Sequence, residues 1–160
     1  MKKENLTPLD RTDKKILNLL QHNSKLSNLE LAEAVGLSPT PCARRVKRLE
    51  DEGIIIRQIT LVDPEKLGFN LTVFVGVEMD RHTHDRFKDF EQAIAQMPEI
   101  HECHLITGQN ADFLLKVIVK DMPHYEDFLL HKLTHLGGVR GVHSSFVLRN
   151  LIDSKLLNLM

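Results

Sequence analysis

The chain has 160 residues, 42% of them hydrophobic, and a formal net charge of −1. This length allows a packed core in one domain or in two small ones. No run approaches the roughly 18 consecutive apolar residues of a membrane span, and the start has no apolar signal-peptide segment, so we expect a cytoplasmic protein.

The first predicted helix starts near Asp10 and ends near residues 22–23. Asp10 and Asp13 suit a first helical turn, where the helix dipole favours negative charge. Ile16, Leu17 and Leu20 recur at helical spacing, so we expect them to pack on the helices that follow.

A short second helix and a tight turn are predicted next. Ser27 and Glu30 form the S-x-x-E capping box, in which each side chain satisfies a free backbone N–H. Gly36 lies where the chain must leave this helix, and we expect a positive φ there. Ser38 is then the predicted N-cap of a third helix, with Pro39 in its first turn.

The third helix combines an apolar stripe with a cationic face. Cys42, Val46 and Leu49 form the stripe at positions i, i+4 and i+7. Short helix, glycine turn and basic helix together predict a helix-turn-helix, whose second helix enters the major groove of DNA. The residues expected to contact DNA are Ser38, Thr40, Pro41, Arg44, Arg45, Lys47 and Arg48.

The charge distribution agrees with this prediction. Residues 1–60 carry 11 Lys and Arg against 8 Asp and Glu, whereas residues 61–160 carry 10 against 14. A basic head on an acidic body suits a protein of which one part approaches phosphates. A plain helical hairpin with a solvated charged face is the alternative for this segment.

The second half alternates strands and helices in the order βαββαβ. The predicted elements are strand 71–79, helix 85–97, strand 100–107, strand 112–120, helix 123–136 and strand 142–149. Both helices carry apolar stripes, so both can cover one face of an antiparallel sheet in a ferredoxin-like domain. The fold class is therefore α+β, with a helix-turn-helix domain in 1–60, a linker in 61–70 and a ferredoxin-like domain in 71–160.

Three features suggest further contacts. The β-branched run 54–62 predicts a small wing or a strand that pairs with a partner. The sheet face opposite the helices is expected to expose Val, Ile and Phe, which predicts a dimer. The apolar segment 151–160 is expected to pack on the second domain or on a neighbour.

The chain resembles the Lrp/AsnC family of leucine-responsive and asparagine-responsive transcription regulators. The likeness rests on the opening LD-x-x-D-x-x-IL from Leu9, on the segment GLSPTPCARRVKRLEDEGII, and on weaker motifs near residues 63–68, 107–115 and 138–139. This resemblance implies a winged helix-turn-helix, an effector-binding and oligomerisation domain, and dimers that often assemble into octamers.

The effector site is expected at the loop 107–112. Gly108 would let backbone N–H groups reach a carboxylate, and Asp112 could accept hydrogen bonds from an ammonium group, so an amino acid fits. Nearby apolar residues favour leucine or methionine. The expected effector-binding residues are Leu105, Gly108, Gln109, Asn110, Ala111, Asp112, Val142 and Ser144. The resembling family uses this loop, although its aspartate usually follows the glycine by three residues, and here by four. A polar hairpin loop is the alternative.

Other functions have less support from the sequence. No nucleotide-binding or hydrolase motif occurs, and we predict no catalytic residue, no cofactor and no metal ligand. Asp127, His131 and His135 share one helix face but lack the further ligands of a zinc site. Two alternatives stay open. One is a tetrapyrrole-binding enzyme like the similar sirohaem decarboxylases, and the other is a DNA-coating protein without an effector.

Overall fold

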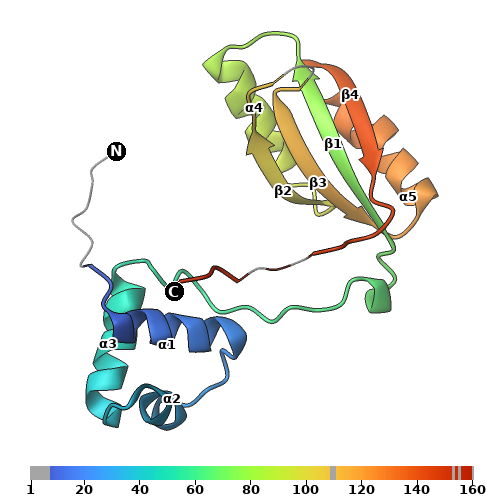
Figure 1. Cartoon of the computed structure of the whole chain (residues 1–160). Helices are drawn as coiled ribbons and strands as arrows, with labels where there is room; N and C mark the ends of the chain where they lie inside the picture. Colours follow the sequence, from blue (N-terminus) through green and yellow to red (C-terminus); the bar gives the residue numbers. More distant parts are fainter. Residues whose placement is uncertain (1–7, 109–110, 153, 155, 160) are drawn as a thin grey trace. The chain divides into compact units, whose positions relative to one another are not determined.

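The structure is a computed structural model that describes residues 8–108, 111–152, 154 and 156–159. Its described residues form two compact units, which are treated separately here (Figure 1). Met1–Leu61 and Ile152–Met160 make up the first unit, which we call the head, and Val62–Leu151 make up the second, which we call the sheet domain. Within the described residues, no helix is long and apolar enough to cross a membrane.

The head contains three helices, α1 (Arg11–His22), α2 (Asn28–Val35) and α3 (Pro39–Asp51). Asp10 caps α1 and Ser27 caps α2, each through a capping box with the residue three positions later. Gly36 ends α2 with a φ of 73°, as predicted. The predicted stripes meet in one core, whose buried members are Ile16, Leu17, Leu31, Ala32, Cys42 and Leu49.

The segment after α3 forms no strand within this chain. Residues 54–63 are all described and have neither helical nor strand structure. Ile56 is 87% exposed and Ile59 is 58% exposed. The predicted small wing is therefore not formed in the single chain, because the segment has no neighbouring strand to pair with. Pairing with a partner stays a prediction.

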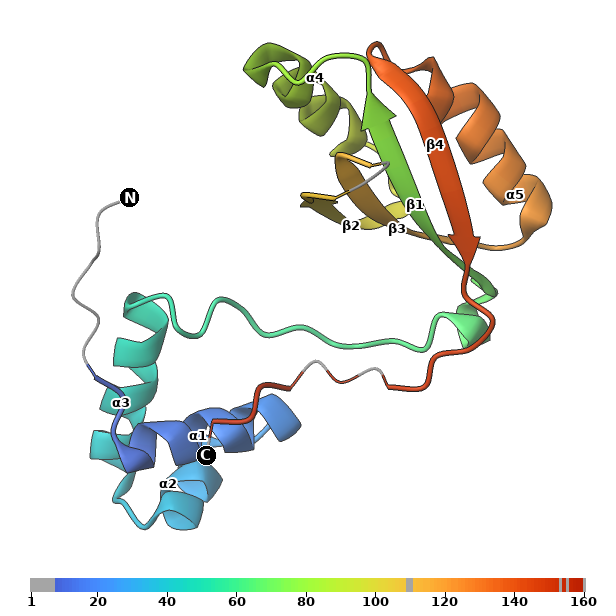
Figure 2. The ribbon, with the colours of Figure 1, turned by 45° about the horizontal axis from the view of Figure 1, so that its top comes forward.

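The sheet domain has the predicted βαββαβ order. Its strands are β1 (Leu71–Met79), β2 (Ile100–Leu105), β3 (Phe113–Val119) and β4 (Val139–Phe146), and they form an antiparallel sheet in the order β2-β3-β1-β4. Helices α4 (His84–Ile94) and α5 (Met122–Asp127) lie on the same face of it (Figure 2).

The last helix differs from the single helix predicted for 123–136. A π-helical turn, η2 (Phe128–Lys132), and a 3₁₀ turn, η3 (Leu133–His135), continue α5. The wider π turn rotates the apolar positions, so Phe128 is fully buried while Leu129 is only partly buried. Strand β4 also begins three residues before the predicted position 142.

The open face of the sheet is less apolar than predicted. The valines of β1 and β3 alternate onto the helix-covered face, where they are fully buried. Phe74, Leu114 and Ile118 lie on the open face beside Thr72 and Lys116. The prediction that valines would be exposed there is wrong because the register places them inside, but three large apolar side chains do remain on this face.

The C-terminal segment also differs from its prediction. It was expected on the second domain or on a neighbour, but its described residues belong to the head. Leu159 packs against the head's apolar core. The contacts of this segment therefore differ from the prediction, which grouped it with residues 71–160.

Candidate nucleic-acid interface and effector site

At the start of α3 the hydroxyl groups of Ser38 and Thr40 form no hydrogen bond with the described residues. Ser38 occupies the N-cap position, but its side chain makes no capping hydrogen bond. The usual donor would be the backbone N–H of the third helical residue, and here that residue is Pro41, which has none. The Asn28 side chain instead donates to the Pro39 carbonyl at 2.9 Å and fixes this end of α3 against α2. Ser38 therefore keeps its hydroxyl available to a ligand.

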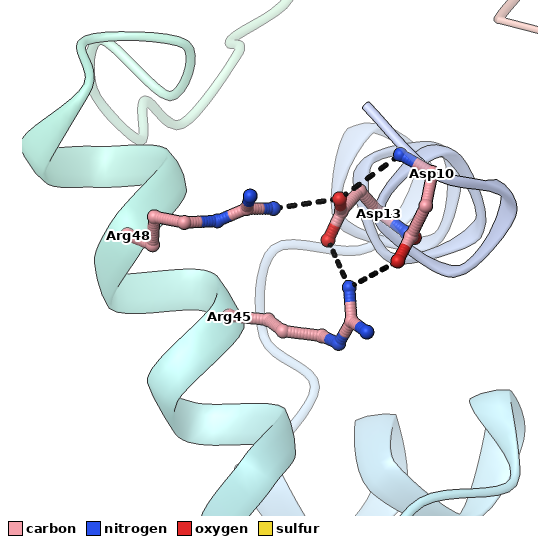
Figure 3. A network of polar contacts seen from close by, with 4 residues as sticks. All are labelled: Asp10, Asp13, Arg45 and Arg48. Carbon is pink, nitrogen blue, oxygen red and sulfur yellow. Dashed lines mark hydrogen bonds and ion pairs between the residues drawn. The ribbon is translucent and has the colours of Figure 1, made fainter. Parts of the chain in front are cut away.

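Two of the four cations of α3 are held by α1 (Figure 3). Arg45 Nη1 lies 2.7 Å from Asp10 Oδ2 and 2.8 Å from Asp13 Oδ1. Arg48 Nη2 lies 2.6 Å from the other oxygen of Asp13. Asp13 is 1% exposed, so this carboxylate is a buried anchor between the two helices.

The ion pairs set the protonation of the carboxylates. Burial alone would raise the pKa of Asp13, but hydrogen bonds from Arg48, Arg45 and the Asp10 backbone together outweigh burial, so its pKa lies below the usual value. The backbone N–H of Asp13 and the Arg45 guanidinium lower the pKa of Asp10. Both carboxylates are therefore charged at neutral pH.

The remaining cations differ from this pair. Arg44 and Lys47 are exposed and form no ion pair in the described part of the chain. The sequence suggested that the four cations of α3 form one uniform face. In the structure they differ, because two of them are paired with carboxylates. Arg44 and Lys47 point to solvent, whereas Arg45 and Arg48 connect α3 to α1.

The head is expected to lose stability in acid. A carboxylate with a lowered folded pKa stabilises the fold above its unfolded pKa, about 3.9 for Asp, and this contribution is lost as the pH falls through the folded value. Thermal melts of the parent and Asp13→Asn at pH 7 and pH 3 check this. The difference in Tm between the two proteins should shrink in acid, and a difference independent of pH would contradict the assignment.

The predicted effector loop is anchored at the end of β1. Asp112 accepts a hydrogen bond from the Met79 N–H at 2.8 Å, and its other oxygen lies 2.9 Å from His82 Nε2. The Asp112 N–H donates to the Val77 carbonyl. Asp112 thus connects its own end of the loop to the end of β1, although its side chain stays partly exposed and a carboxylate can accept further bonds.

A second turn meets the same end of β1. The Asp80 N–H donates to the Gly138 carbonyl, one residue after the bond from Met79 to the effector loop. Arg86 pairs with Asp80 at 3.2 Å, and its side chain packs on Gly138, whose φ of 94° and close neighbours suit glycine. Asp112 and Gly138 therefore both bond the end of β1, at the neighbouring residues Met79 and Asp80.

The other predicted effector residues are distributed differently. Ala111 lies over Gly76, where an added Cβ would be 3.2 Å from the Ala111 Cβ and 3.9 Å from the His143 Cβ. Val142 instead packs with the core, and the Ser144 hydroxyl bonds the Tyr125 hydroxyl, so both lie on the helix-covered side. Leu105 is exposed and Gly108 has open space. Gln109 and Asn110 lie outside the described residues.

The histidines form no metal centre among the described residues, where no three His, Cys, Asp or Glu side chains are placed to share an ion. His131 pairs with Asp127 at 3.2 Å and stacks on His135.

Two family models match the chain. A winged helix-turn-helix DNA-binding model covers residues 9–56, and the Lrp/AsnC ligand-binding domain covers residues 72–157. The leucine-responsive regulatory protein of Haemophilus influenzae is 43% identical over 157 residues, which are 98% of this chain and 94% of that protein. The leucine-responsive regulatory protein of Escherichia coli K12 is 42% identical, and the match covers 93% of this chain and 90% of that protein. The chain belongs to the Lrp/AsnC family.

Solved structures of Lrp/AsnC regulators have the same fold. A transcriptional regulator of Neisseria meningitidis, solved as a complex with L-Met, gives a TM-score of 0.90 at 40% identity, covering 95% of this chain and 97% of its own. An AsnC-family regulator of Agrobacterium tumefaciens gives a TM-score of 0.89 at 36% identity, and the match covers 94% of this chain and 97% of its own. The chain is thus a DNA-binding transcription regulator of the Lrp type.

Three residues that the sequence analysis did not select lie beside Ala111 and Asp112, and they are Gly76, His82 and His143. Gly76 lies inside strand β1, and an isolated strand glycine signals close approach of another part of the chain. That signal could have located the Ala111 contact. His143 and His82 gave no comparable signal, because only the register of β4 and the path after β1 bring them close to Ala111 and Asp112.

Proposed function

We propose that this Lrp/AsnC regulator acts in the cytoplasm, binds double-stranded DNA through the α3 helices of paired heads, and responds to methionine or leucine bound at loop 107–112. The observation that supports DNA binding most directly is that α3 has two kinds of cation, exposed ones on its outer face and paired ones facing α1. The hydroxyls of the first turn of α3 bond none of the described residues and its outer face offers exposed cations, while the inner cations are paired with Asp10 and Asp13.

The positions of these residues on α3 suggest a role for each of them in DNA binding. Ser38, Thr40 and Pro41 lie at the N-terminal end of α3, which in a helix-turn-helix faces base edges and nearby phosphates. Arg44 and Lys47 can reach guanines or phosphates without losing a protein partner. Arg45 and Arg48 act mainly by fixing α3 on α1, and reach DNA only with their outward N–H groups.

Support for an amino-acid effector comes from the chemistry of the residues at the ends of loop 107–112. Asp112 offers carboxylate oxygens for an ammonium group, and the N–H groups near Gly108 suit a carboxylate. The N. meningitidis neighbour was solved with L-Met, and the two relatives given above are named for leucine. A ligand with different affinity for two assemblies would shift their equilibrium and so change DNA binding.

Calorimetric titration with methionine and leucine tests this site. Asp112→Ala should weaken binding roughly 10- to 100-fold, the effect of losing a charged hydrogen bond of about 1.5–3 kcal/mol. His82→Ala should retain binding because it leaves the Asp112 carboxylate in place. Asp85→Ala, an exposed aspartate in the first turn of α4, is the matched control. Equal binding to the parent and Asp112→Ala would place the site elsewhere, and no heat with any of the twenty amino acids would contradict the effector proposal.

The open sheet face supports assembly into a homodimer, with octamers built from dimers. Phe74 is 37% exposed at the centre of this face, between Leu114 and Ile118 on the neighbouring strand. The exposed apolar residues of segment 54–62 offer a second place for strand pairing. Two recognition helices would then meet successive faces of DNA, so the preferred sites should be imperfect palindromes.

Replacing open-face residues is expected to dissociate the assembly. Phe74→Asp with Ile118→Asp would place two desolvated carboxylates in the interface, so the protein should sediment as a monomer at micromolar concentration. Leu130→Asp is the control, because Leu130 is 47% exposed on the helical layer. An unchanged sedimentation coefficient in the double variant would show that the interface lies on another surface.

We infer no catalytic function. The family is one of transcription regulators, and the cations of α3 have a use in binding DNA but none in an enzyme. Purified protein should therefore be colourless and should not bind added haem.

A further inference from the structure

The C-terminal residues 156–159 pair with the side of α1. The Gln21 side-chain amide donates to the Leu157 carbonyl at 3.2 Å, and the Leu157 N–H donates to the Gln21 Oε1 at 2.8 Å. One side chain thus satisfies both backbone groups of Leu157, as a neighbouring strand would. In Figure 2 this dark red end of the chain runs beside α1.

Apolar contacts extend this pairing in both directions. Leu159 packs with the head's core and borders a cavity of about 340 Å³ with Leu9 and the stems of Lys14 and Lys15. Leu156 borders another cavity of about 280 Å³ with Leu20, Ile55 and Ile59. Residues 156–159 therefore contact α1 along its length and also reach the segment that follows α3.

These contacts leave the outer cations of α3 free. Neither Arg44 nor Lys47 borders the cavities next to residues 156–159. Asp13, which holds Arg45 and Arg48, is about 80° around α1 from Gln21 at roughly 100° per residue. A DNA duplex and the C-terminal segment can thus occupy one head together.

Because the chain leaves the head and later returns to it, the contact of residues 156–159 with α1 connects the head to the sheet domain a second time. The chain passes from the head to the sheet domain after Leu61 and returns to the head at Ile152. We propose that residues 156–159 form a strap, docked on α1, that gives each head a second connection to the sheet domain and so sets the separation of paired α3 helices. The docking stands on the contacts above, and its effect on spacing rests on the proposed DNA-binding function.

The strap changes affinity through geometry. Two linked heads bind paired half-sites with an effective concentration that depends on how well their separation matches the DNA. A head on one linker samples many separations, whereas a head on two connections samples few. The strap should therefore favour one half-site spacing without altering the affinity of a single head.

Hydrogen exchange on the full chain tests docking. Gln21→Ala removes both hydrogen bonds at a half-buried helical position where alanine is well tolerated. Loss of two ordinary hydrogen bonds should speed exchange at the Leu157 amide roughly 5- to 100-fold. Gln92→Ala, at an exposed position in α4, is the matched control and should change nothing. Equal, free-chain exchange at Leu157 in the parent and Gln21→Ala would overturn the docking.

DNA binding tests the consequence. Duplexes selected from random sequence are compared with versions that have one half-site or altered half-site spacing. Gln21→Ala, and deletion of residues 152–160 as a second variant, should bind paired half-sites several-fold more weakly, show a flatter spacing preference, and bind one half-site like the parent. Unchanged spacing preference in both variants would overturn the positioning role. If the parent binds no DNA, the proposed function fails and the positioning role with it, while hydrogen exchange still decides the docking.

Discussion

Replacing Arg44 and Lys47 together with alanine is expected to weaken DNA binding by about 100-fold or more, since contacts to bases or phosphates contribute about 1–3 kcal/mol each. Both side chains are exposed and have no ion pair among the described residues, so Tm should stay within about 2 °C of the parent. Fluorescence anisotropy at several salt concentrations measures the affinity. The slope of log K against log salt should also become shallower by about one per lost phosphate contact.

Arg45→Ala is the matched control on the same helix. It also removes a cation, but one that bonds Asp10 and Asp13, so it should lower Tm as well as affinity. Full DNA affinity in the Arg44/Lys47 double variant would contradict the assignment of the outer face. Replacing Arg44, Arg45 and Arg48 together would not separate the two roles, because two of the three removals also loosen the head.

The different roles of the α3 cations show which parts of the head can be predicted from the sequence. Capping boxes, the Gly36 turn and the stripe of α3 depend on residues within a few positions, so local patterns located them. Asp13 bonds Arg45 across 32 residues. No spacing rule connects two helices over that distance, so the cations of α3 looked equivalent until the packing of α1 was known.

The sheet domain shows the same limit. Strand β1 was predicted with its correct bounds, because alternation of valines marks a strand with one buried face. The side of the sheet to which each residue points depends on register, and the sequence alone did not give it. Val142 and Ser144 were therefore grouped with the effector loop although they face the helices, and Gly76 was overlooked.

The apolar composition of the C-terminal segment predicts that it packs on another surface, but it does not predict which surface. The Gln21 amide bonds Leu157 across 136 residues, and a lone glutamine on a helix carries no signal for such a contact. Composition predicted packing, and the structure shows that Leu159 is partly buried against the head whereas Leu156 and Leu157 stay 41% and 72% exposed.

Asp13→Ala is expected to destabilise the head by about 3 kcal/mol. Removing one partner of a buried ion pair costs about 3–5 kcal/mol because the remaining charges lose their partner. The lower end applies here, since the side chains of Arg45 and Arg48 are 33% and 30% exposed and can turn towards water. Chemical denaturation followed by circular dichroism measures the free energy of unfolding.

Asp10→Ala separates the buried carboxylate from the capping effect. Asp10 also bonds Arg45 and caps α1, but its side chain is 50% exposed, so its loss should lower the free energy of unfolding clearly less than the loss of Asp13. Equal costs for the two variants would mean that burial of Asp13 contributes nothing to the anchor. A larger cost for Asp13→Ala, with DNA affinity lost in proportion to unfolding, would show that this carboxylate serves the DNA-binding surface by holding α3 in place rather than by touching DNA.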